Sequence, residues 1–180
     1  MKLDAKQTAL VFIDVQGRLH ELMHEKEILD KNLERLLRVA DLLELPLLCT
    51  EQIPEKLGAT NEPFRSLLKN APVLAKTSFS CWGEPVFQKA LAETRCKQVV
   101  LMGIETHVCV YQTALDLLEE GFEVCVAADA VSSRSAENKR LVLEAMRDAG
   151  ATILPTESIL FALLRDAKNV QFKSLLQLIK

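Results

Sequence analysis

Gln-Val-Val-Leu-Met-Gly-Ile, residues 98–104, is an almost unbroken apolar run, and Glu-Thr-His-Val-Cys-Val at residues 105–110 follows it directly. A run of this length and composition is typical of a strand buried on both faces. Apolar side chains then recur at helical spacing over residues 107–120, and Gly121 predicts the end of that helix. A second apolar run follows at residues 122–127. This order of strand, helix and strand predicts a βαβ unit with parallel strands.

The same alternation continues in both directions from this unit. Apolar runs predict further strands at residues 8–15, 47–51, 72–76 and 152–155. Helical spacing predicts helices at residues 29–43, from 63, at 85–93 and at 136–149, and one or two more near the C-terminus. Six strands joined by right-handed crossovers predict an α/β protein, built as a three-layer αβα sandwich around a parallel sheet. The length of 180 residues suits a single domain over residues 1–180.

The composition restricts the class of function. Hydrophobic residues make up 49% of the chain and charged residues 26%, which indicates a packed core rather than disorder. The net charge of −3 argues against a nucleic-acid partner. The N-terminus carries charge where a signal peptide needs an apolar core, and no apolar run approaches the roughly 18–20 residues of a spanning helix. We therefore expect a cytoplasmic protein that acts on a small molecule and has no membrane partner.

The five cysteines do not form a recognisable framework. Their number is odd and no Cys-x-x-Cys pair occurs, so neither a set of disulfides nor a cysteine zinc site is expected. Cys49 and Cys125 lie inside apolar runs and are interpreted as small core residues. Cys109 differs, because it falls in the first turn of the helix after the strand at residues 98–104.

Three chemically useful residues lie at predicted strand ends, where ligands bind in open parallel sheets. Burial of Asp14 would raise its pKa and suit it to accept a proton, although it could also be a loop or cap carboxylate. Lys76 could pair with Asp14, or pack its stem while its amine reaches water. The helix start should lower the pKa of Cys109 and make it a nucleophile, unless it is a structural cysteine. Together they could form one pocket in which the carboxylate takes the thiol proton.

Other residues near these strand ends are candidates for substrate binding or for packing: Gln16, Glu51, Phe79, Trp82 and Thr106.

Several segments together resemble the isochorismatase-like, or cysteine hydrolase, family over nearly the whole chain. They are Ala-Leu-Val-Phe-Ile-Asp-Val-Gln at residues 9–16, Lys-Thr-Ser-Phe at 76–79 and Gly-Ile-Glu-Thr-His-Val-Cys-Val at 103–110. A weaker similarity is Ala-Ala-Asp-Ala-Val at residues 127–131. Each segment is common by itself, and their order and spacing carry the resemblance.

The resemblance implies a six-stranded sheet in the order 3-2-1-4-5-6, which periodicity alone does not give. It implies a catalytic triad of Asp14, Lys76 and Cys109, and a thioester on the cysteine during amide cleavage. It also implies a cis peptide between Ile104 and Glu105, with backbone N–H groups near Glu105 and Cys109 forming an oxyanion hole. A homo-oligomer is implied as well.

Two departures from family patterns refine the expected activity. Residues 50–54, Thr-Glu-Gln-Ile-Pro, lack the histidine of the metal motif in nicotinamidases, so we expect no metal, no cofactor and a substrate other than nicotinamide. The resemblance is to the metal-free, uncharacterised members. The presence of Cys109 favours cleavage of an amide, ureide or other C–N bond. Two alternatives stay open: vinyl-ether hydrolysis without a covalent step, and a non-catalytic scaffold or redox-responsive binding protein.

Other polar residues could also contribute. His20 and His24 have a spacing that can bind zinc, but solvent-facing side chains are the expected interpretation. His107 could touch substrate, or face solvent or a neighbouring subunit. Arg134 could bind a substrate carboxylate or form a surface salt bridge.

Overall fold

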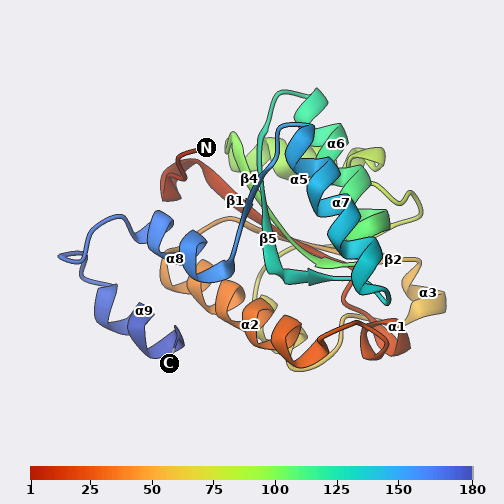
Figure 1. Ribbon diagram of the computed structural model, residues 1–180, viewed down its shortest axis with the longest axis horizontal. Helices are drawn as coiled ribbons and strands as arrows, with labels where there is room; N and C mark the ends of the chain where they lie inside the picture. The colour runs from red at the N-terminus through yellow and green to blue at the C-terminus, as the bar shows by residue number, and fades with distance from the viewer. Residues whose placement is uncertain (180) are drawn as a thin grey trace.

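The computed structural model describes residues 1–179, which form a six-stranded, all-parallel sheet (Figure 1). The strand order is β3-β2-β1-β4-β5-β6. The strands are β1 (Thr8–Ile13), β2 (Leu47–Gln52), β3 (Val73–Lys76), β4 (Gln98–Ile104), β5 (Glu123–Ser132) and β6 (Thr152–Leu154). Both the predicted fold class and the sheet order implied by the resemblance are confirmed.

Helices cover both faces of the sheet, as Figure 1 shows. One face packs against α2 (Lys26–Leu42), α4 (Phe64–Leu68), α8 (Thr156–Leu164) and α9 (Phe172–Ile179). The other face packs against α5 (Pro85–Thr94), α6 (Tyr111–Glu119) and α7 (Ala136–Asp148). Two short helices lie near the carboxyl ends of the strands, α1 (Gly17–Glu21) and α3 (Pro54–Leu57). Within residues 1–179, no helix combines the length and the apolar character needed to cross a membrane.

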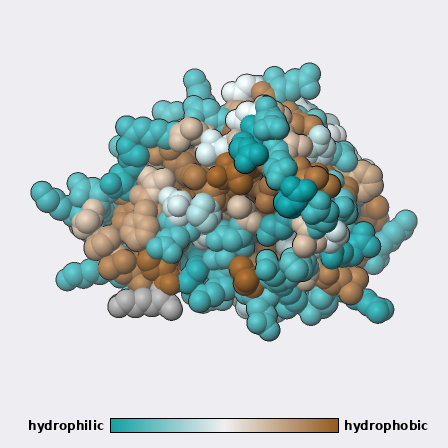
Figure 2. Space-filling view, in the orientation of Figure 1, coloured by the Kyte–Doolittle hydropathy of each residue, from teal (hydrophilic) through white to brown (hydrophobic). Residues whose placement is uncertain are grey.

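The central strands explain the unbroken apolar runs in the sequence. Every residue of β1 and β4 is buried, because helices lie on both sides of them. Along β1, Leu10 and Phe12 contribute to the core beside α2, whereas Val11 and Ile13 contribute to the core beside α5 and α6. Burial of each such side chain contributes roughly 1.5–3 kcal/mol relative to exposure. In the view of Figure 2, the surface over α2 is mostly hydrophilic, and hydrophobic residues gather between α7 and α8.

Three local features differ from the prediction. β5 runs to Ser132 rather than ending near residue 127, because after a register shift opposite β4 it pairs again, through Val131 and Ser132. The helix predicted over residues 107–120 begins with a π-helical turn, Thr106–Val110, before α6. Short helices occupy residues 17–21 and 54–57, for which the sequence predicted no helix.

Gly103 allows the close approach of β4 to the end of β1. Its φ is +123°, and a Cβ at this position would collide with the backbone of Ile13. Ile13 is the last residue of β1, and Asp14 follows it with a φ of 52°. A glycine in β4 therefore sets the backbone position from which the Asp14 side chain extends.

Candidate active site

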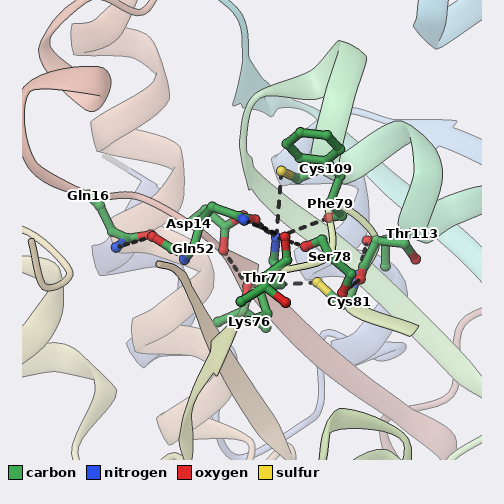
Figure 3. Close-up of polar contacts among 12 residues, drawn as sticks. Asp14, Gln16, Gln52, Lys76, Thr77, Ser78, Phe79, Cys81, Cys109 and Thr113 are labelled. Carbon is green, nitrogen blue, oxygen red and sulfur yellow. Dashed lines mark hydrogen bonds and ion pairs between the residues drawn. The ribbon is translucent and has the colours of Figure 1, made fainter. Parts of the chain in front are cut away.

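Asp14, Lys76 and Cys109 meet at the carboxyl ends of the strands (Figure 3). Asp14 follows β1, Lys76 is the last residue of β3, and Cys109 lies in the π-helical turn after β4. Lys76 Nζ lies 2.7 Å from Asp14 Oδ2 and 3.6 Å from Cys109 Sγ. The three residues are buried, so the structure brings together the groups that the sequence analysis selected.

The Asp14 carboxylate is held from two directions. Its Oδ1 accepts a hydrogen bond of 2.7 Å from Thr50 Oγ1, and its Oδ2 faces the ammonium group of Lys76. Thr50 lies on β2, opposite Ile13 in the strand register. Oδ2 has no other polar partner among the described residues, so this oxygen is the one free to receive a proton.

The Lys76 ammonium lies in a shell of acceptors. It donates to Gln52 Oε1, to the carbonyl oxygen of Ser78 at 3.1 Å and to that of Phe79 at 3.0 Å, besides its contacts with Asp14 and Cys109. Burial by itself would lower the pKa of Lys76, but the Asp14 carboxylate attracts the ammonium and the pKa is raised. Lys76 therefore stays charged in the interior.

Burial disfavours ionisation of the Cys109 thiol, which corrects the expectation of a lowered pKa. Burial raises the pKa of Cys109 to about 12, and repulsion by the Asp14 carboxylate adds to this effect. The positive charge of Lys76 lowers the pKa of Cys109, but this effect is smaller than that of burial. A thiolate here would be a second buried anion beside Asp14, so the carboxylate opposes ionisation of the thiol.

The loop after β3 is fixed by Glu84, which the sequence analysis did not select. Glu84 Oε1 accepts hydrogen bonds from the backbone N–H groups of Thr77 (2.8 Å) and Ser78 (3.0 Å) and from Ser78 Oγ (2.8 Å). The bonds from the Ser78 and Thr77 backbone lower the pKa of Glu84 to about 2. The carbonyl groups of Ser78 and Phe79 point at Lys76, so Glu84 acts on Lys76 through this loop.

A cavity of about 140 Å³ opens beside the three residues. Its polar lining comes from Asp14, Gln52, Glu105 and Cys109, and its apolar lining comes from Leu19, Leu57, Phe79, Ile104 and Val108. The helices α1 and α3 supply Leu19 and Leu57. Phe79 is 54% exposed and forms part of the rim. A larger hollow of about 340 Å³ between α2 and residues 67–72 holds none of the three residues.

The segment between β4 and the π-helical turn forms one wall. The peptide bond between Ile104 and Glu105 is cis. The carboxylate of Glu105 accepts from Arg134, at 3.0 Å from Nε and 3.2 Å from the backbone nitrogen. Arg134 therefore forms a salt bridge, one of the two roles expected for it. His107 Nδ1 lies 2.9 Å from Ser133 Oγ and is not in the cavity lining.

Of the five candidates for substrate binding, the structure brings only Phe79 to the cavity. Gln16 instead accepts from the backbone N–H of Gln52 at 2.7 Å, and Glu51 accepts from the Thr60 backbone at 2.7 Å. These two residues brace the segments that carry the wall. Trp82 packs edge-on against Phe122, with ring centroids 5.7 Å apart, and Thr106 is fully buried.

His20 is buried, which corrects the expectation that it faces solvent. Its Nε2 lies 2.6 Å from Asp30 Oδ1, and its ring packs edge-on against Phe64. Within residues 1–179, no group of three or more His, Cys, Asp or Glu side chains is placed to hold a metal ion.

Similar proteins share this architecture along nearly the whole chain. The model of the isochorismatase domain matches residues 8–158. Isochorismatase family protein 1B of Dictyostelium discoideum is 36% identical, covering 99% of this chain and 89% of that protein.

Three solved structures are also close. The MAR1 ribonuclease of Caenorhabditis elegans is 33% identical with a TM-score of 0.93, and the match covers 99% of this chain and 92% of that one. YcaC of Pseudomonas aeruginosa with covalent acrylamide is 28% identical with a TM-score of 0.92, and the match covers 98% of this chain and 91% of that one. The YcaC gene product of Escherichia coli, an octameric hydrolase of unknown specificity, is 27% identical with a TM-score of 0.94, and the match covers 99% of this chain and 89% of that one. The sheet order, the matching domain model and these identities agree. The chain therefore belongs to the isochorismatase-like hydrolase family.

Proposed function

We propose that this chain hydrolyses a small amide, ureide or related C–N substrate, with Cys109 as nucleophile, Asp14 as general base and then acid, and Lys76 as electrostatic partner. The observation that carries the proposal is the position of Lys76 Nζ, within 2.7 Å of Asp14 Oδ2 and 3.6 Å of Cys109 Sγ beside the cavity. An ammonium in contact with both a carboxylate and a thiol supplies the parts that acyl transfer through a cysteine requires.

The first half of the reaction transfers the acyl group to sulfur. Cys109 Sγ attacks the carbonyl carbon while its proton moves to Asp14 Oδ2, so the net charge of the buried site does not change. Backbone N–H groups near Glu105 and Cys109 would receive the oxyanion. Asp14 then gives the proton to the leaving nitrogen as the C–N bond breaks, and a thioester on Cys109 remains.

The second half uses water. Asp14 takes a proton from a water molecule, whose oxygen attacks the thioester carbon. The C–S bond breaks, the acid product leaves, and the proton returns to the thiol. Throughout the cycle, Lys76 stays positive and stabilises whichever of Asp14 and Cys109 carries negative charge.

The lining of the cavity favours this reaction over hydrolysis of the vinyl ether of an isochorismate-like acid. None of the described lining residues carries a cation that could bind a substrate carboxylate, and the carboxylates of Asp14 and Glu105 are each paired with a cation. The Pseudomonas aeruginosa relative is described with covalent acrylamide, which supports the presence of a nucleophile in a protein of this fold. By analogy with the octameric Escherichia coli relative, we propose a homo-oligomer, which light scattering of the purified protein would test.

The decisive experiment combines trapping with two variants. The wild-type protein is mixed with amide substrates and quenched, and intact-mass spectrometry is used to find an acyl adduct that maps to Cys109. Loss of turnover in both Cys109→Ala and Asp14→Ala, together with the adduct, would support the proposal. Turnover that survives Cys109→Ala but not Asp14→Ala would instead establish the vinyl-ether type of chemistry, and cleavage of RNA with no action on amides would reject the proposal.

A further inference from the structure

The cavity is too small for most ligands of drug size. Its volume of about 140 Å³ lies below the roughly 300–1,000 Å³ of typical ligand pockets. An apolar cavity of about 150 Å³ in another protein is filled by benzene, which has six non-hydrogen atoms. The part of the substrate that enters this cavity is therefore expected to have about five to seven non-hydrogen atoms.

The walls that would surround the non-reacting part of the substrate are apolar. Leu19, Leu57, Phe79, Ile104 and Val108 come from four separate segments and line the same space. Such walls stabilise hydrocarbon by removing it from water, and they leave a buried hydroxyl or amide without a partner. Selectivity for short aliphatic groups follows from this lining.

The polar side chains of the lining are already engaged within the protein. Gln52 donates from Nε2 to the carbonyl of Thr77 at 2.9 Å, and its Oε1 accepts from Lys76. The Glu105 carboxylate accepts from Arg134 at 3.0 Å. Asp14 pairs with Lys76 at 2.7 Å. Because these side chains are held by partners within the protein, the reacting groups are the ones best placed to bind a polar group of the substrate, which is its amide.

The charges close to the cavity are balanced in pairs. Lys76 neutralises Asp14, and Arg134 neutralises Glu105. A carboxylate on the substrate would meet apolar walls and two existing carboxylates, and the arginine would have to leave Glu105 to reach it. An ammonium on the substrate would lose its hydration and find both carboxylates already paired.

We infer that the substrates are uncharged primary amides of short aliphatic acids, from about three to five carbon atoms, with Leu57 and Val108 among the residues that set this selectivity. The inference rests on the proposed cysteine hydrolase activity. The amide group lies against Cys109 and Asp14, and the alkyl group lies against the apolar walls. Hydrolysis of such a compound releases ammonia and the short carboxylic acid, with water as the only co-reactant.

A matched pair of substrates tests this inference. Butyramide and succinamate have the same chain length, and a carboxylate replaces the terminal methyl group in succinamate. We expect kcat/KM for ammonia release to be at least about ten-fold higher for butyramide than for succinamate, and likewise higher for butyramide than for the longer octanamide. Equal or better use of succinamate would overturn the inference, because Arg134 or another cation would then bind the carboxylate.

A change of one wall residue sharpens the test. Leu57 is 37% exposed at the rim, so Leu57→Lys places a cation beside the alkyl group with little cost to the core. This variant should raise kcat/KM for succinamate relative to butyramide by about ten-fold. Val170→Lys adds the same charge at a position that is 91% exposed and outside the cavity lining, and it should leave the ratio unchanged.

The outcomes separate this inference from the proposed function. If no amide of either kind yields ammonia or a thioester on Cys109, the proposed hydrolase activity is wrong. If a thioester forms and ammonia is released, but charged or long amides are preferred, only the assigned substrate class is wrong.

Discussion

Lys76 and Asp14 form an ion pair of 2.7 Å in which the two side chains are only 1% and 3% exposed. Removal of either partner leaves an uncompensated charge in the interior, whereas removal of both leaves none. The pair therefore ties the activity of the site to the stability of the fold, and the two effects can be separated by substitution.

Lys76→Met should lower the free energy of unfolding by about 3–5 kcal/mol, because the Asp14 carboxylate is left buried without its cation. Combining it with Asp14→Asn should recover much of this loss while activity stays absent. Urea unfolding of the single and double variants measures the difference. Additive losses in the double variant would show that the buried charge is not the cause.

Cys109→Ala should reduce kcat by at least about a thousand-fold, because the covalent step has no substitute. Cys96→Ala is the matched control: Cys96 is also a buried free cysteine, lies outside the cavity lining, and its loss should leave kcat unchanged. Steady-state release of ammonia measures both variants. A Cys109→Ala variant with near-normal kcat would remove the nucleophile from the mechanism.

Asp14→Asn should make Cys109 more reactive toward iodoacetamide even though it abolishes turnover. The carboxylate raises the pKa of the thiol, so its removal leaves Lys76 unopposed and increases the thiolate fraction at pH 8. The rate of alkylation of Cys109, followed by peptide mass spectrometry, tests this effect. Slower alkylation in the variant would mean that Asp14 activates the thiol before substrate enters.

Glu84 is a positioning residue, and its two substitutions should differ. Glu84→Ala removes the acceptor that holds the Thr77 and Ser78 N–H groups, so the carbonyl groups facing Lys76 shift and kcat should fall about ten-fold, with little change in KM. Glu84→Gln keeps an oxygen at the same place and should restore most of kcat. Equal activity in all three proteins would show that the loop holds its shape without Glu84.

The pH dependence of stability should also reveal Glu84. Its pKa is lowered to about 2 in the folded protein from an ordinary value of 4.5, so its charged form stabilises the fold. This stabilisation is fully present above pH 4.5 and is lost as the pH falls toward 2. The advantage of wild type over Glu84→Gln in urea unfolding should therefore shrink over that interval. An advantage that does not change with pH would mean that charge plays no part.

The apolar runs and their spacing predicted the layers of the sheet, because β1 and β4 are buried on both faces. Asp14, Lys76 and Cys109 could be selected because parallel strands end at one edge. The short helices α1 and α3 could not be predicted, since five and four residues do not establish a helical period.

Other features of the site depend on contacts between distant segments. The raised pKa of Cys109 follows from its burial beside Asp14, which is 95 residues earlier in the chain. The start of a helix by itself lowers the pKa of a thiol, which is the opposite direction. The role of Glu84 depends on a loop conformation that brings its carboxylate to the backbone of Thr77 and Ser78. Hydrophobic periodicity in the sequence does not predict the conformation of such a loop. The contact of Thr50 with Asp14 likewise depends on the register of β1 and β2, which places Thr50 beside the residue that precedes Asp14.

Lys76 ends β3, a four-residue strand at the edge of the sheet whose first residue, Val73, is 40% exposed. It has a neighbouring strand on one side only. Edge strands open at lower free energy than central ones, and opening of this one would withdraw the ammonium from Asp14 while the rest of the sheet stays folded. On warming, activity should therefore be lost at a lower temperature than the one at which the whole protein unfolds. Substitutions that hold this short strand more firmly to β2 would extend the temperature range of activity without any change to the reacting groups.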